Sequence, residues 1–137
     1  MEQKTITLVQ DSFEKVRPIA ATAADIFYTK LFELDPTLKP LFPSSEEGMK
    51  AQGNKLMTML AAAVAGLSNL EALVPVLQNL GKRHVEYKVE PSHYNTVGAA
   101  LLATLAVGLG DDFTPEVKEA WASVYGTMST VMIEASY

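Results

Sequence analysis

Residues 75–84 read PVLQNLGKRH, and this stretch carries the most informative side chain of the sequence. His84 follows Leu77 and Leu80 at spacings of seven and four residues, so it extends the apolar stripe of a helix into the protein interior. Lys82 and Arg83 come directly before it. Two interpretations are open on this pattern alone. Positive charge at the end of a helix offsets the helix dipole, and a neutral imidazole is a good metal ligand.

Helical periodicity continues on both sides of this stretch. Apolar residues recur every three or four positions through residues 6–16, 20–31, 49–67, 77–84, 97–109 and 117–132. Helix starts are expected at or near Pro18, Pro75, Pro91 and Pro115, and the prolines within residues 35–45 predict short turns. No segment of useful length alternates with a period of two. We therefore expect an all-α fold of about seven helices, with residues 1–137 as a single domain.

The composition limits the classes of function. A chain of 137 residues with net charge −5 has room for one domain and lacks the basic character of a nucleic-acid-binding protein. The absence of cysteine excludes disulfides, iron–sulfur clusters and thiolate ligation of a haem. The first ten residues lack the apolar core of a secretory signal. The longest apolar run, residues 97–110, is shorter than the roughly 20 residues that span a bilayer. We expect a cytoplasmic protein without a membrane partner.

The other residues with chemical potential have ordinary explanations when each is taken alone. His93 stands at the start of a predicted helix, where a capping or surface role is expected, and two histidines cannot complete a closed zinc site by themselves. No serine lies in a GxSxG motif, so a hydrolase is not indicated. Tyr28 could be a core tyrosine and Gln52 an exposed helix residue.

Four segments together resemble the globin family. They are FYTKLFELDPTLKPLF at residues 27–42, NLGKRH at 79–84, SHYNTVG at 92–98 and AWASVYG at 120–126. Each string is weak alone, but the four follow one another in the family's order across essentially the whole chain. They are most similar to flavohaemoglobin-type and neuroglobin-like globins, as in a single-domain bacterial haemoglobin. The resemblance implies a globin fold around a haem pocket and favours the ligand interpretation of His84.

Site residues follow from the resemblance position by position. His84 corresponds to the proximal iron ligand of a haem b, and Phe42 to the phenylalanine that packs on the haem face. Tyr28 and Gln52 correspond to the residues that contact the gas on the distal side, and Leu56 to the apolar residue one turn further. Further candidates for contact with the haem are Lys55 and Arg83, through its propionates, and Val97.

The expected function is reversible binding of dioxygen or other diatomic gases, for storage, delivery or scavenging. Tyrosine and glutamine both donate hydrogen bonds, and bonds to charged groups contribute about 1.5–3 kcal/mol each, which implies high affinity and slow release of dioxygen. Oxidation of nitric oxide to nitrate with a separate reductase is the alternative. A haem sensor is less favoured because no output domain is evident. A monomer and a homodimer both remain open.

Three departures from the family pattern bear on mechanism. Gln52 stands where neuroglobin-like proteins have a distal histidine, so ligation of the iron by two histidines is not expected. Flavohaemoglobins carry a reductase domain that these 137 residues lack, and a glutamate near the end of the globin domain. Tyr94 matches the tyrosine that accompanies that glutamate, but Ser136 stands at the glutamate position and Glu134 is two residues out of register. Peroxidase-like chemistry and efficient dioxygenase chemistry are therefore not favoured.

Overall fold

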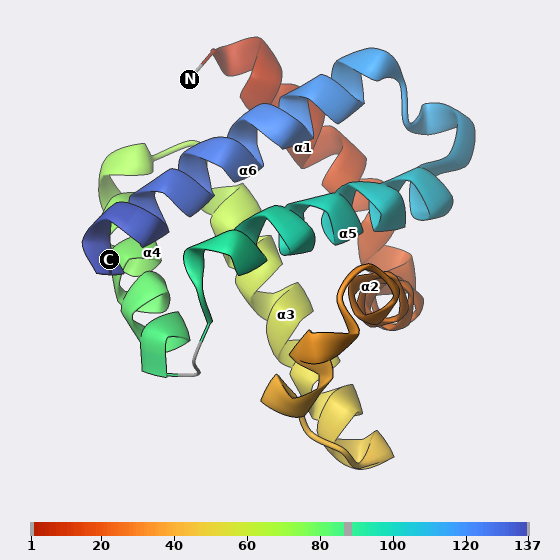
Figure 1. The fold of residues 1–137 in the computed structure, drawn as a ribbon. Coiled ribbons are helices and arrows are strands. Elements are labelled where there is room, and N and C mark those ends of the chain that lie inside the picture. Colours follow the sequence, from red (N-terminus) through yellow and green to blue (C-terminus); the bar gives the residue numbers. More distant parts are fainter. Residues whose placement is uncertain (1, 87–88, 137) are drawn as a thin grey trace.

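The computed structural model describes residues 2–86 and 89–136, and this part of the chain is built from helices (Figure 1). In chain order they are α1 (Gln3–Val16), η1 (Arg17–Ile19), α2 (Ala20–Leu34), η2 (Pro36–Leu41), α3 (Glu46–Gly66), α4 (Leu70–Glu86), α5 (Pro91–Leu109), η3 (Gly110–Asp112) and α6 (Pro115–Ser136). The three η elements are short 3-10 helices. No strand occurs within the described ranges, and the predicted all-α class is confirmed.

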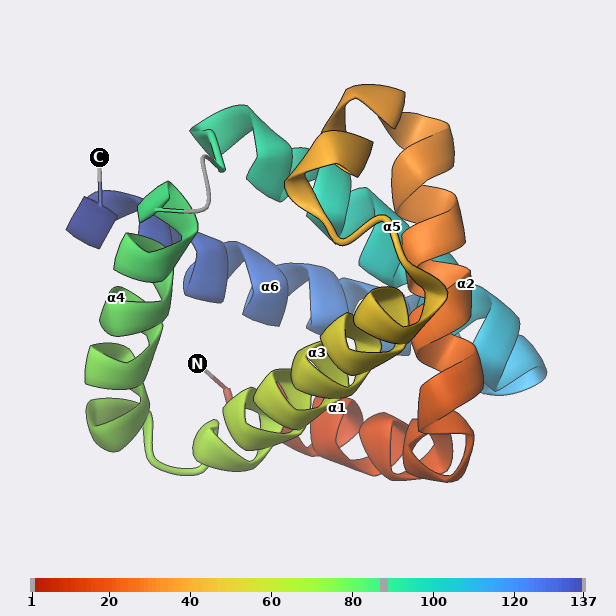
Figure 2. The same cartoon turned by 90° about the horizontal axis from the view of Figure 1, so that it is seen from below.

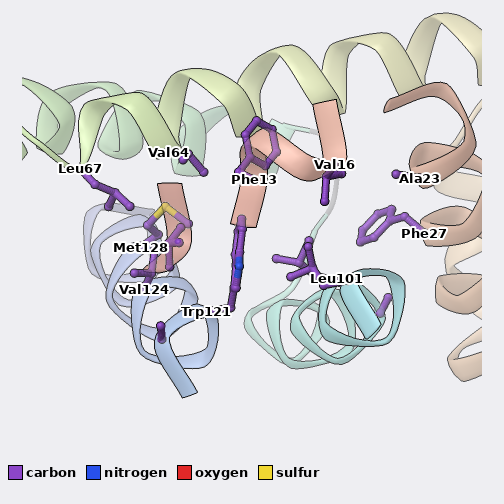
Figure 3. Packing of buried hydrophobic residues seen from close by; sticks show 14 of the residues in the cluster. Phe13, Val16, Ala23, Phe27, Val64, Leu67, Leu101, Trp121, Val124 and Met128 are labelled. Carbon is purple, nitrogen blue, oxygen red and sulfur yellow. The ribbon is translucent and has the colours of Figure 1, made fainter. Parts of the chain in front are cut away.

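The predicted apolar stripes form one hydrophobic core. Every stripe residue of α1 and α6 is buried, namely Ile6, Val9, Phe13, Val16, Val117, Trp121, Val124, Met128 and Met132. Figure 3 shows the indole of Trp121 pointing from α6 toward Phe13 of α1, with ring centroids 6.2 Å apart. Leu101 of α5 and Val64 of α3 join the same cluster. All six α-helices contribute buried residues to it.

Local sequence signals set several of the helix ends. Ser45 Oγ accepts a hydrogen bond of 3.0 Å from Gly48 N–H at the start of α3, which is the geometry of an N-cap. Thr114 Oγ1 accepts in the same way from Val117 N–H at the start of α6. Gly110 ends α5 with a φ of +56°, a conformation that side chains rarely adopt. His93 Nδ1 accepts from Glu90 N–H at 3.0 Å, so the predicted capping role of His93 is confirmed.

The predicted start of the helix that carries His84 is wrong. We expected Pro75 to open this helix, whereas α4 begins at Leu70 and Pro75 lies inside it. Asn69 Oδ1 accepts from Ala72 N–H at 3.5 Å, so Asn69 caps the helix five residues earlier than expected. Pro75 is exposed and lies within the first two turns, where its missing N–H deprives only the carbonyl of Glu71 of a partner within the helix.

The arrangement of α3 and α4 decides where a site can form. The two helices diverge from the connection after Gly66, and η2 and the start of α5 lie toward their open ends (Figures 1 and 2). Helix α4 packs most extensively on α6 and touches α3 much less. In the described part of the chain, no helix combines the length and apolarity needed to cross a membrane.

Candidate functional site

The imidazole of His84 is held in a defined tautomer near the end of α4. Its Nδ1 atom lies 2.6 Å from the carbonyl oxygen of Leu80, and the ring is half-buried. A carbonyl oxygen can only accept a hydrogen bond, so Nδ1 carries the proton and donates. In the neutral ring the lone pair is then on Nε2. A metal-binding histidine needs this arrangement, because the hydrogen bond of one ring nitrogen orients the other as the ligand.

Tyr94, in the first turn of α5, lies beside His84. The two ring centroids are 6.0 Å apart and the ring planes are inclined by 46°. The backbone of Tyr94 is fixed from α6, since the hydroxyl of Tyr125 donates a 2.7 Å hydrogen bond to the carbonyl oxygen of Tyr94. Burial raises the pKa of Tyr125 well above its usual range, with a smaller contribution from Tyr94, so this hydroxyl remains a donor.

Sequence reasoning missed Tyr125 as part of the site. The residue follows Val124, one position off the inner stripe of α6, and its ring packs against Gly98 of α5. A Cβ added at Gly98 would lie 2.8 Å from that ring. The string at residues 120–126 contains the tyrosine, but periodicity gives no indication of its partner on another helix.

Tyr28 and Phe42 meet where α2 and the end of η2 approach α3. Their ring centroids are 5.4 Å apart in an edge contact, and Phe32 lies 5.5 Å from Phe42. The hydroxyl of Tyr28 donates a long hydrogen bond of 3.5 Å to the backbone carbonyl of Gln52. The structure therefore brings together three predicted site residues that are separated by up to 24 positions in the chain.

The phenol of Tyr28 is a neutral hydrogen-bond donor. Its side chain is buried, and desolvation raises the pKa of the phenol to about 12, although a hydrogen bond with the side chain of Gln52 opposes this rise. A phenol with this pKa is protonated throughout the physiological range. Tyr28 is thus able to donate a hydrogen bond to an acceptor in its neighbourhood, while a phenolate that could itself bind a metal is disfavoured.

The remaining predicted residues lie on the helices around these two groups. Leu56 on α3 and Val97 on α5 are half-buried and pack against the hydrophobic core. Lys55 on α3 and Arg83 on α4 are exposed. Within residues 2–86 and 89–136, no three His, Cys, Asp or Glu side chains come together in a way that could hold a metal ion.

Comparison with known proteins gives one matching family model and several related proteins. The Globin family model matches residues 25–132. The chain is 29% identical over 133 residues to the Flavohemoprotein of Bacillus subtilis, with 97% of this chain and 33% of the relative covered. Flavohemoproteins of Rhodopirellula baltica and Vibrio cholerae are 30% and 28% identical, with 97% and 98% of this chain and 33% and 34% of each relative covered. The chain thus spans about a third of the length of these curated relatives.

The chain belongs to the globin family. Membership of this family implies a haem-binding site, and the residues present fit such a group. In globins the haem iron is held by a histidine nitrogen. In the neutral ring of His84 the lone pair is on Nε2, and Phe42, Leu56 and Val97 are half-buried apolar side chains from three different segments. His84 would hold the iron of such a group, and the apolar side chains would contact its porphyrin.

Proposed function

We propose that the chain binds a haem b through Nε2 of His84 and that the protein then binds dioxygen reversibly. The observation that carries the proposal is the hydrogen bond from His84 Nδ1 to the Leu80 carbonyl, because it fixes the tautomer that a ligand needs. The chain has no cysteine, so attachment of the haem through thioether bonds is excluded. When bound, the haem iron supplies the coordination position for the gas.

The protein's contribution on the distal side is a pair of hydrogen-bond donors. Tyr28 is protonated at neutral pH, and its 3.5 Å bond to the Gln52 carbonyl is long enough to be exchanged for a better acceptor. The side-chain amide of Gln52 is the second proposed donor. A hydrogen bond to a ligand with partial negative charge contributes about 1.5–3 kcal/mol, and about 1.4 kcal/mol changes an equilibrium constant tenfold.

Apolar side chains and surface cations complete the proposed site. Phe42 contacts both Tyr28 and Phe32, and we expect this aromatic group to exclude water from the side of the site that Tyr28 occupies. We assign Leu56 and Val97 to contact with the porphyrin. Lys55 and Arg83 are exposed cations that suit its propionates, whose pairing at the surface is worth little energy but helps to orient the group.

All the described α-helices contribute to a single hydrophobic cluster, and we therefore propose that residues 1–137 act as one globin domain. Absorption spectra of the purified protein with haem, in ferric, ferrous and oxygen-exposed forms, test the function. Reversible spectral changes on cycles of oxygen addition and removal are expected. A protein that takes up no haem, or that oxidises at once without a reversible oxygen-bound form, contradicts the proposal.

A second candidate function is the oxidation of nitric oxide to nitrate, with electrons from a separate reductase. This candidate is supported by the similarity of the chain to about a third of the length of three flavohemoproteins. The two functions differ in the rate at which the iron is re-reduced. Nitric oxide consumption over many turnovers with a cellular reductant supports the second candidate, whereas a single turnover leaves oxygen binding as the function.

A further inference from the structure

Gly81 lies where the backbone of α4 rests directly on α6. A Cβ atom built at Gly81 would be 2.5 Å from the carbonyl oxygen of Met132, 2.9 Å from Met132 Cα and 2.7 Å from Ser136 Oγ. Real Cβ atoms essentially never approach other atoms this closely. Two of these three atoms belong to the backbone of α6 and cannot rotate away. Any side chain at position 81 must therefore push the two helices apart.

The contact at Gly81 is important for the site because α4 has one main support. Helix α4 packs most extensively on α6, and Figure 2 shows it diverging from α3 toward its C-terminal end. His84 comes one turn after Gly81, near that end. Leu80, which precedes Gly81 directly, provides the carbonyl that orients the His84 ring. A displacement of α4 at Gly81 thus moves both the ring and the group that orients it.

We propose that Gly81 is a positioning residue for His84: its lack of a side chain lets α4 sit on α6 at the depth that directs Nε2 toward the haem iron. This inference rests on the proposed role of His84 as the axial ligand. Ordinary contact distances begin at 3.4 Å, so a methyl group at position 81 requires about 0.9 Å more separation from Met132 O. Misplacement of a reacting group by about 1 Å is enough to change its chemistry strongly.

The decisive comparison is between Gly81→Ala and Gly126→Ala. Gly126 lies on α6, is exposed, and a Cβ there would meet nothing within 4 Å, so it controls for the intrinsic preference of alanine for helices. Two readouts of the haem-loaded protein are used: the iron–histidine stretching band in the resonance Raman spectrum of the ferrous form, and the rate of haem loss to an excess of scavenging apoprotein. Circular dichroism confirms that each variant is folded.

We expect Gly81→Ala to shift the iron–histidine band and to speed haem loss about tenfold, while Gly126→Ala matches the wild type in both. Ser136→Val adds bulk beside Gly81 from the α6 side, and we expect a smaller change in the same direction. If Gly81→Ala does not fold, Ser136→Val tests the positioning role in its place. A folded Gly81→Ala, or failing that Ser136→Val, with wild-type band and haem loss overturns the positioning role but not the proposed function. A wild-type protein without an iron–histidine band overturns both.

Discussion

The indole nitrogen of Trp121 donates a 2.8 Å hydrogen bond to Ser12 Oγ, and this bond joins α6 to α1 inside the core. Trp121 has no exposed surface and Ser12 is also buried. The serine hydroxyl donates in turn to the carbonyl of Leu8 at 2.7 Å. The large side chain at the centre of the core therefore has its polar atom satisfied across 109 positions of sequence.

Replacement of Ser12 by alanine should lower the free energy of unfolding by about 1–3 kcal/mol, because the indole N–H is left buried without its acceptor. Urea unfolding measures the loss. Phenylalanine has no N–H group, so in a Trp121→Phe background the Ser12 hydroxyl has no indole donor to accept from. There, replacement of Ser12 by alanine should lower the free energy of unfolding clearly less. An equal cost in both backgrounds would show that the hydrogen bond is not the source of the stabilisation.

Removal of either proposed distal donor should speed the release of dioxygen. We expect Tyr28→Phe and Gln52→Leu each to increase the release rate constant by about 10- to 100-fold, since each deletes one hydrogen bond to a partly charged ligand. Stopped-flow mixing of the oxygen-loaded protein with carbon monoxide measures the rate. Gln3→Leu, at an exposed position of α1, serves as the control. If both distal variants release oxygen at the wild-type rate, neither residue is a donor.

The stability of the protein should decrease at alkaline pH because of Tyr28. Its pKa is about 12 in the folded state, against an ordinary value of 10.0. Between these values the folded state keeps a proton that the unfolded state loses, so the free energy of unfolding falls as the pH rises; below pH 10 this effect is absent. Removing the phenol in Tyr28→Phe should reduce the fall by about 2 kcal/mol at pH 11.5. Urea unfolding from about pH 9 to 11.5 compares the two proteins. Identical slopes would contradict the buried, neutral phenol.

Much of the fold follows from periodicity in the sequence. The stripes of α1 and α6 are buried as expected because each helix presents one apolar face to the same core. Four half-buried members of the predicted α3 stripe, Met49, Leu56, Met57 and Leu60, are less enclosed than the α1 and α6 residues. The start predicted at Pro75 is wrong because the side chain of Asn69 caps α4, and Pro75 lies inside the helix.

The site was predictable to a smaller extent. The position of His84 on an apolar stripe indicates an inward imidazole, but only the structure identifies Leu80 as the acceptor of its Nδ1 proton. Tyr28 and Phe42 were assigned through the family resemblance, and the structure brings them into contact. Neither the bond from Tyr125 to α5 nor the contact at Gly81 has a local signal, since both depend on how two distant helices pack.

The most direct test of the proposed site replaces His84 by glycine and supplies imidazole in solution. Wild-type protein should bind one haem per chain and show the ferrous spectrum of a histidine-ligated iron; His84→Gly should lose that spectrum and regain it when imidazole fills the space of the missing side chain. His93→Gly, which removes the other of the two histidines, is the matched control and should keep the wild-type spectrum. A His84→Gly protein with the wild-type spectrum in the absence of imidazole would contradict ligation by His84.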